Sequence, residues 1–230
     1  MTHTAALHAR AAAHSLGDAL TRLRHAAAAE AAHIACEGLY AADGLRSTTY
    51  GVRYGSGGHS DPTATTYLVH DRPFQVNRSQ ALYDDLTEQL RQLAAPLPGA
   101  GTPLDRIHAA IPRMRADIAQ AAACALHRLD EVARRHLHIG PARRSLSGPK
   151  APACPVCGIR NLHLQTAGPQ DAWTVVCDGE WRDGRLNPCL CVGPGCPCGV
   201  DGAVPGVAHI WPRDAVIGAV AGAAPTQPAN

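Results

Sequence analysis

The stretch CLCVGPGCPCG, residues 189–199, places four cysteines within ten positions. The residues between them are leucine, valine, glycine and proline, which offer little surface for a hydrophobic core. Small residues between thiols let a backbone fold closely around a metal ion, and the metal–thiolate bonds then replace the missing apolar burial. We therefore expect metal binding to decide the fold of this part of the chain.

The residues before this stretch predict a small β-hairpin that begins at a metal knuckle. Cys154-Pro-Val-Cys157 has the two-residue spacing that lets both thiolates reach one ion, and a glycine follows it. Residues 161–166 alternate polar and apolar side chains, and residues 173–177 form a β-branched return strand that ends in Cys177. A hairpin that rises from a CxxC knuckle and ends in a third cysteine is the plan of a zinc ribbon.

The region offers eight candidate zinc ligands: Cys154, Cys157, Cys177, Cys189, Cys191, Cys196, Cys198 and His209. A structural zinc ion takes four ligands, so this set suits one ion or two. In one arrangement the first four surround one ion and the last four surround another. In the alternative, a single site uses Cys154, Cys157 and two later cysteines, and the sequence does not decide between the two.

The zinc is expected to be structural, and the protein is not expected to be an enzyme. A catalytic zinc keeps an open position beside a general base, but the chain has no HExxH motif and no HxE paired with PCxxC. His163 lies on a predicted strand and is interpreted as a packing or surface residue. Cys36 and Cys124 lie on predicted helices and are interpreted as small core residues.

The chain before the cysteine region has helical periodicity. Apolar residues from Leu16 to Ile34 recur at spacings of three and four in a long helix expected over 5–37, and only Glu30 interrupts them. Asn77 and Gln80 have the spacing of a capping box before a leucine-rich helix, and Thr102 caps another. Pro112 should interrupt that helix. The apolar face expected beyond it consists of Met114, Ile118, Ala121, Ala125, Leu129 and Val132.

These patterns predict a mainly α N-terminal helical bundle or hairpin plus a small β zinc-ribbon-like C-terminal domain. The helical domain is expected over 1–139, with a glycine-rich loop at 50–61. A basic linker is expected over 140–153, the cysteine domain over 154–213 and a tail over 214–230. Aromatic residues are only 4% of the chain, which favours alanine-lined helices packed closely together.

Composition also bounds the location of the protein. The start of the chain lacks the apolar core of a signal peptide, and no apolar run reaches the length of a membrane span. A cytoplasmic protein without a membrane partner is expected. In a reducing compartment, nine cysteines favour metal binding over disulfides.

Basic charge concentrates between positions 127 and 150, where six basic residues stand against two acidic ones. The nucleic-acid-binding candidates are Arg134, Arg135, Arg143, Arg144 and Lys150. Such an arm beside a zinc ribbon would lie along phosphates and release counterions, so nucleic acid or the transcription machinery is the predicted partner. The alternatives are a solvated linker, or arginines that offset the charge of the thiolate–zinc centre.

A second functional hypothesis is protein–protein interaction. In it the long first helix forms a coiled-coil homodimer and the zinc is purely structural. Both hypotheses describe a protein without catalytic activity.

The segments YGSGGHSDPT, CPVCG, WTVVC and CLCVGPGCPCG followed by VAHIWP carry a resemblance over most of the chain. They resemble a group of zinc-ribbon-bearing proteins of actinobacteria and their phages, which implies a zinc ribbon without implying an activity. GGHSDPT alone also resembles a segment of phage regulators of late or autolysin operons. Those regulators are similar to sigma-factor region four and end in a helix-turn-helix, whereas this chain ends in its cysteine region.

Overall fold

The computed structural model describes residues 3–46, 76–146, 148, 150–182, 185–200 and 203–218. The glycine-rich loop predicted at 50–61 and most of the predicted tail lie outside the described residues. The chain forms two compact units, Met1–Thr21 with Leu86–Asn230 and, separately, Arg22–Asp85. The larger unit therefore holds the first residues of the chain and residues 86–139 together with the cysteine region, whereas the sequence predicted a helical domain over 1–139 and a separate cysteine domain over 154–213.

The mainly helical character of the N-terminal part is confirmed. Helix α1 spans Thr4–Arg46, longer than the expected 5–37, and α4 spans Arg78–Ala94. Helix α5 (Pro103–Ala110) leads through the 3₁₀ turn Ile111–Arg113 into α6 (Ala116–His136), so the α-helix is interrupted at Pro112 as predicted. Within the described ranges, no helix combines the length and apolarity needed to cross a membrane.

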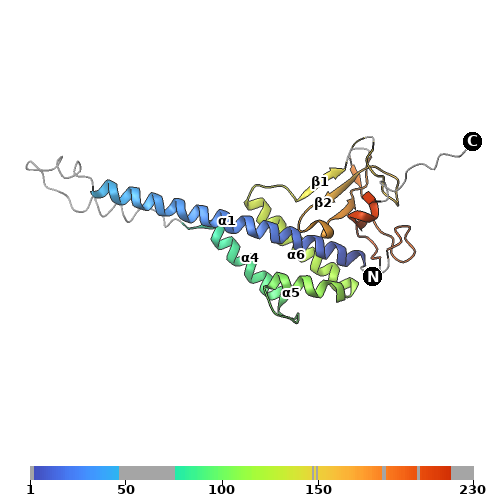
Figure 1. Cartoon of the computed structure of the whole chain (residues 1–230), viewed down its shortest axis with the longest axis horizontal. Coiled ribbons are helices and arrows are strands. Elements are labelled where there is room, and N and C mark those ends of the chain that lie inside the picture. The colour runs from blue at the N-terminus through green and yellow to red at the C-terminus, as the bar shows by residue number, and fades with distance from the viewer. Residues whose placement is uncertain are drawn as a thin grey trace, which may run out of the picture. The chain divides into compact units, whose positions relative to one another are not determined.

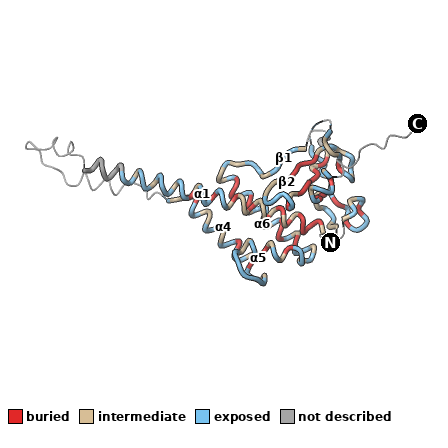
Figure 2. Tube along the Cα trace, viewed as in Figure 1, coloured by how far each residue is buried: buried red, intermediate tan, exposed pale blue. Residues whose placement is uncertain are grey.

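The core of the helical part of the larger unit combines alanines with leucines and isoleucines. The start of α1 contributes three buried alanines and Leu16, and α6 contributes Ala123 and Leu126. Figure 1 shows α6 running beside this part of α1, and Figure 2 shows buried positions gathered where these helices meet the sheet. Alanine faces bury little area per residue, so the alanine-lined packing expected from the low aromatic content is only part of this core.

Helix α4 begins with two separate caps inside the smaller unit. The Gln80 amide donates to Asn77 Oδ1 at 2.8 Å, as predicted, but the Gln80 side chain bonds Asp84 and does not close a capping box. The two carboxylate oxygens of Glu30 instead accept from the amides of Arg78 and Ser79, each at 3.0 Å. The acidic residue that interrupts the apolar face of α1 therefore caps the positive end of α4.

The buried face of α6 differs from the predicted one. Ile118 and Val132, expected in the core, are 50% and 41% exposed, and Ala121 is exposed as well. The buried positions lie on the neighbouring face: Ala119, Ala122, Ala123, Leu126, Asp130, Ala133 and Arg134. An ion pair takes part of this face, while Met114 and Leu129 of the predicted stripe still pack against the core. Periodicity counting cannot foresee the ion pair because it scores charged residues as solvent-facing.

A four-stranded antiparallel sheet follows the helices, in the order β1-β2-β3-β6. The predicted hairpin is confirmed by β2 (Leu162–Gln165) and β3 (Thr174–Cys177), which pair Leu162 with Cys177. Strand β1 (Arg143–Leu146) lies within the segment predicted as a linker and pairs with β2. The linker prediction is corrected for residues 143–146, because their backbone is hydrogen-bonded into the sheet. Strand β6 (Ile210–Pro212) closes the other edge, and β4 (Glu180–Arg182) and β5 (Arg185–Asn187) form a separate hairpin.

The sheet packs against the first turns of α1. Leu7 forms a buried cluster with Val176 of β3 and Ile210 of β6. At the next position, His8 Nε2 lies 2.9 Å from the carbonyl oxygen of Ala208, and burial lowers the pKa of His8. The contact between helix and sheet is therefore part of the fold, and it holds the segment just before β6 in place.

Candidate metal centre

Four thiols meet at one end of the β2–β3 hairpin. Cys154 and Cys157 come from the knuckle, Cys177 ends β3 and Cys189 follows β5. Their sulfur atoms all lie within 4.8 Å of one another. We call these residues the four-cysteine group.

The knuckle is shaped by its backbone. The Gly158 amide donates to the Cys154 carbonyl at 2.9 Å, and the Cys154 amide donates to the Ile159 carbonyl at 2.9 Å. The Val156 amide points at Cys154 Sγ at 3.4 Å, and the Gly179 amide points at Cys177 Sγ at the same distance. Amides directed at sulfur stabilise thiolates, which are the form of cysteine that binds metals.

The sulfur separations fit a tetrahedral ion and exclude disulfides. Cys154 Sγ lies 4.0 Å from Cys189 Sγ, and Cys157 Sγ lies 3.7 Å from Cys177 Sγ. Zinc–sulfur bonds of about 2.3 Å in a tetrahedron place the sulfurs about 3.8 Å apart. A disulfide would need about 2.05 Å, and all nine cysteines are free.

A second set of four side chains meets beside the first. Cys191, Cys196 and Cys198 lie on the turns after β5, and His209 directly precedes β6. Their ligand atoms also lie within 4.8 Å of one another. We call these residues the cysteine–histidine group.

The loop of the cysteine–histidine group repeats features of the knuckle. The Gly193 amide points at Cys191 Sγ at 3.4 Å, and the Cys196 amide donates to the Gly193 carbonyl at 3.0 Å. The Gly206 amide donates to the Cys191 carbonyl at 2.8 Å. The structure thus brings the eight sequence-predicted ligands together in two groups of four, which is the first of the two arrangements considered from the sequence.

The two groups meet at His209, which the structure buries almost completely. Its Nε2 lies 3.2 Å from Cys196 Sγ within its own group. Its Nδ1 lies 3.1 Å from Cys189 Sγ of the four-cysteine group. The two nitrogens of this imidazole therefore contact sulfur atoms of different groups.

Two thiols of the four-cysteine group are difficult to ionise without a cation, whereas one thiol of the cysteine–histidine group ionises readily. Burial first, and then the neighbouring cysteines, raise the pKa of Cys177 to about 12, and burial likewise raises the pKa of Cys189. Amides of Cys198 and Val192, followed by His209, lower the pKa of Cys196 to about 6. A bound divalent ion supplies the positive charge that thiolates at Cys177 and Cys189 need.

His163 is a packing residue, as the sequence indicated. It is buried on β2, and its Nδ1 lies 2.8 Å from Asp178 Oδ2. It belongs to neither group of candidate ligands.

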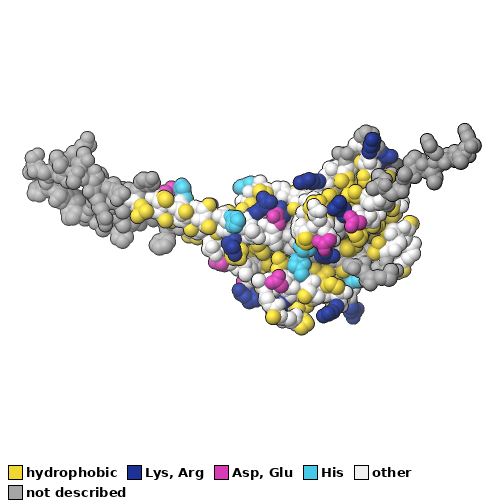
Figure 3. All heavy atoms as spheres, viewed as in Figure 1, with side chains coloured by type: hydrophobic (Ala, Val, Ile, Leu, Met, Phe, Trp, Pro, Cys, Tyr) yellow, Lys and Arg dark blue, Asp and Glu magenta, His cyan; other side chains and the backbone are white. Residues whose placement is uncertain are grey.

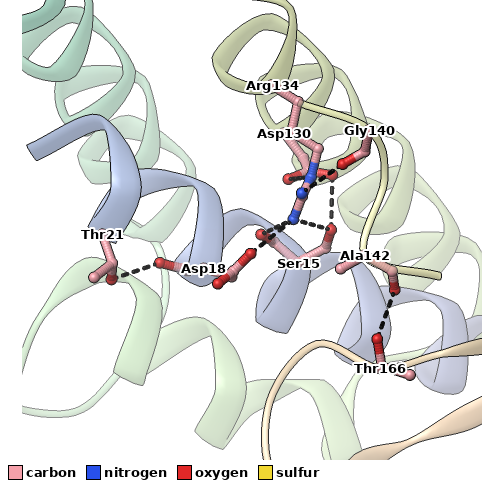
Figure 4. Close-up of polar contacts among 9 residues, drawn as sticks. Ser15, Asp18, Thr21, Asp130, Arg134, Gly140, Ala142 and Thr166 are labelled. Carbon is pink, nitrogen blue, oxygen red and sulfur yellow. Dashed lines mark hydrogen bonds and ion pairs between the residues drawn. The ribbon is translucent and has the colours of Figure 1, made fainter. Parts of the chain in front are cut away.

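Arg134 is not part of an exposed basic surface, and its prediction as a phosphate contact is corrected. Its side chain is 8% exposed, and its Nε lies 2.8 Å from an Asp130 oxygen. The guanidinium also bonds the Gly140 carbonyl at 2.9 Å, the Ser15 carbonyl at 3.1 Å and Asp18 at 3.2 Å. Figure 4 shows these groups converging from α1, α6 and the chain after α6. No local pattern indicates this network, because α1 and α6 contribute residues more than a hundred positions apart.

The other four predicted basic residues are exposed. Arg135 pairs with Glu131 at 2.7 Å on α6. Arg143 and Arg144 lie on edge strand β1, and no described carboxylate pairs with either; Lys150 lies in the loop beyond.

A cavity of about 360 Å³ lies between α1, α6 and the sheet of the larger unit. Its wall includes His8, Gln120, Cys124 and His163 among several alanines. Cys124 is exposed, and so is Cys36, which corrects the prediction that both are core residues.

The larger unit therefore joins helices to a small sheet with two Cys-rich clusters able to hold metal ions. No family model matches the chain, and neither do any of the curated proteins or solved structures compared with it.

Proposed function

We propose that the protein is a zinc-binding regulatory or accessory protein without catalytic activity, and that a zinc-ribbon-like sheet domain presents a basic edge to nucleic acid or to the transcription machinery. The observation that carries the metal part is the pair of four-ligand groups, with sulfur separations of 3.7 and 4.0 Å in the first. Sets of four cysteines, or of three cysteines and one histidine, are typical of closed structural zinc sites. The knuckle and hairpin support a zinc-ribbon plan.

Zinc would replace apolar burial in this domain. The core around the sheet is small, and two of its fully or nearly buried members, Cys154 and Cys177, are themselves candidate ligands. Structural zinc contributes apparent binding energies of about 10–16 kcal/mol in small peptides. That contribution is comparable to the whole stability of an ordinary domain, which is about 5–15 kcal/mol.

Metal analysis of the purified, reduced, full-length protein tests this part. We expect two zinc ions per chain by native mass spectrometry and elemental analysis. Chelation should abolish amide protection in 154–218, and zinc should restore it. A protein that contains no metal, or that keeps this region ordered after chelation, would contradict the proposal.

The nucleic-acid part rests on the edge of the sheet. Arg143 and Arg144 occupy successive positions of β1, so they point to opposite faces, and both reach one ligand only if it runs along the edge itself. A phosphate backbone has this extended form, and Lys150 lies further along the same connection. On the face drawn in Figure 3, Lys and Arg side chains are spread out with Asp and Glu between them, which favours a narrow contact over a broad basic patch.

Changing Arg143, Arg144 and Lys150 to Ala tests this contact. Three lost phosphate contacts should reduce the slope of log K against log salt by about 2–3 on duplex DNA. The control removes two exposed arginines elsewhere, Arg24 and Arg113, and should leave the slope nearly unchanged. Binding is measured by fluorescence anisotropy with duplex DNA, single-stranded DNA and RNA. No binding of wild-type protein at low salt, or an equal effect of the control, would refute the nucleic-acid part and leave the zinc part standing.

Self-association is the second candidate, and the exposed stripe on α6 favours it. Ile118 and Val132 are half exposed on one helix face with Ala121 between them. The predicted coiled coil along the first helix is less well supported, since Leu16 and Leu23 are fully buried within the chain. Sedimentation of wild type and of Ile118→Glu/Val132→Glu separates the cases, because a dimer through α6 should become a monomer in the variant. A wild-type monomer at all concentrations would exclude this candidate.

A further inference from the structure

We propose that His209 couples the two metal sites, binding the ion of the cysteine–histidine group through Nε2 and donating its Nδ1–H to the thiolate of Cys189 in the four-cysteine group. This inference rests on the proposed zinc binding and adds to it that the two ions are not independent. It follows from the position of one buried imidazole, whose two nitrogens lie 3.2 Å and 3.1 Å from sulfurs of different groups.

The backbone holds the ring in this position. The Cys177 amide donates to the His209 carbonyl at 3.1 Å, and the His209 amide donates to the Cys189 carbonyl at 3.3 Å. The ring also stacks on Trp211, with centroids 5.7 Å apart and planes 19° apart. The imidazole is therefore fixed between strand β3, the Cys189 segment and an aromatic side chain, with little freedom to turn away.

The chemistry of the two nitrogens assigns their roles. Nδ1 belongs to a residue outside the four-cysteine group, whose four thiols already supply a full tetrahedral set. A fifth ligand is not needed there, so the contact of Nδ1 with Cys189 Sγ is a hydrogen bond from N–H to thiolate. Nε2 then carries the lone pair and completes the cysteine–histidine group. A histidine ligand that donates its other N–H to an anion is a better ligand, because the hydrogen bond fixes the tautomer and raises the basicity of the ring.

This arrangement gives positive coupling in both directions. An ion in the four-cysteine group holds Cys189 as a thiolate, which accepts the Nδ1–H and orients Nε2. An ion on Nε2 polarises the ring and makes Nδ1–H a stronger donor to Cys189. Four thiolates and one zinc ion carry a net charge of about −2, so the added donor also offsets excess negative charge. Linkage requires that each ion raise the affinity for the other by the same factor.

The effect is expected to be about tenfold or more in affinity, since loss of an outer hydrogen-bond partner of a metal ligand typically costs about 10–100-fold. It is measured in full-length protein with two single variants. Cys157→Ser removes a ligand of the four-cysteine group that does not touch His209, and Cys198→Ser does the same for the cysteine–histidine group. Cys124→Ser, at an exposed thiol outside both groups, is the matched control.

The affinity of each remaining site is obtained by competition with a chelator, and cobalt absorption distinguishes an all-sulfur site from one with nitrogen. We expect Cys157→Ser to weaken the cysteine–histidine site, and Cys198→Ser to weaken the four-cysteine site, by the same factor of about ten or more. The control should bind two ions like the wild type. If each remaining site had the same affinity in its variant as in the wild type, the coupling would be overturned. Two ions bound to the wild-type protein would still support the proposed function in that case. Wild-type protein that binds no metal would refute both.

A measurement on wild-type protein remains decisive if either serine variant fails to fold. Nitrogen-15 spectra of histidine in the two-zinc protein should show one ring with a metal-bound Nε2 and a protonated, slowly exchanging Nδ1. That assignment should disappear in His209→Ala and persist in His127→Ala, which changes an exposed histidine. A metal-bound Nδ1, or an Nδ1 without a proton, would overturn the assigned role of His209.

Discussion

Replacing Arg134 by methionine is expected to destabilise the larger unit strongly. Methionine keeps most of the apolar stem but removes the guanidinium, which bonds Asp130, Gly140 and both the carbonyl and hydroxyl of Ser15. The change leaves the Asp130 carboxylate, 6% exposed, with only the Ser15 hydroxyl at 2.7 Å. An uncompensated charge would then be buried between α1 and α6.

The magnitude follows from the burial of this pair. Removing one partner of a buried ion pair costs about 3–5 kcal/mol, because the other charge remains desolvated. An exposed pair on the same helix contributes only about 0–1 kcal/mol. Arg135 pairs with Glu131 at 2.7 Å but is 72% exposed, so Arg135→Met is the matched control for Arg134→Met. We expect the two neighbouring substitutions to differ by several-fold in their effect.

Urea unfolding of zinc-saturated protein, followed by circular dichroism, measures the free energy of unfolding for each variant. The double variant Arg134→Met/Asp130→Leu should recover most of the loss, since apolar residues of similar volume often replace a buried pair at little cost. If Arg134→Met were no more destabilising than Arg135→Met, or if the double variant were no better than the single one, the reasoning would be refuted. For the same reason, a variant of Arg134 cannot serve as a test of nucleic-acid binding.

Three further outcomes are expected. Burial first, and then His108, lower the pKa of His14 to about 4, so the unfolded chain binds more protons than the folded chain between pH 4 and pH 6.5. The contribution of neutral His14 to stability should therefore be complete above pH 6.5 and fall toward pH 4. His14→Gln should flatten the wild-type curve of urea midpoint against pH. Glu30→Ala should cost about 1 kcal/mol and speed hydrogen exchange of the first α4 amides, whereas unchanged exchange would exclude its capping role. Gly179 and Gly195 have φ of +86° and +83°, but of the two only a Cβ on Gly179 would meet backbone, 2.0 Å from the Asn187 carbonyl oxygen. Gly179→Ala should therefore lower zinc occupancy of the four-cysteine group, while Gly195→Ala should not. Equal occupancies of the two variants in a metal titration would contradict this.

The local signals of the helices were readable in the sequence because they act within one turn. Thr102 caps its helix as predicted, with Pro103 at the first helical position, and Asp105 adds the second half of a capping box. The proline at 112 interrupts the helix for the equally local reason that it lacks an amide proton. Each of these features needs only residues close in sequence.

The face of α6 could not be predicted in this way, because it is decided by partners far along the chain. Asp130 and Arg134 can be buried because residues of α1 bond to both of them. The Ser15 hydroxyl donates to Asp130, and the Asp18 carboxylate accepts from Arg134. Strand β1 was missed for a similar reason. Its proline- and glycine-rich surroundings indicate a linker, but Arg143 and its neighbours pair in register with β2.

The pairing of the cysteines is where sequence spacing alone is ambiguous, and backbone conformation resolves it. Cys189-Leu-Cys191 and Cys196-Pro-Cys198 have the same spacing, yet the first pair is divided between the groups and the second is not. Leu190 bridges Ala208 and the Cys191 amide donates to the Val207 carbonyl at 2.8 Å, so the first segment is extended and its two cysteine Cα atoms lie about 6–7 Å apart. In the second segment the Gly199 amide donates to the Cys196 carbonyl at 3.2 Å, and this turn brings the two thiols to one ion. An extended CxC therefore serves two neighbouring ions, which is why the two groups lie close enough for one imidazole to contact both.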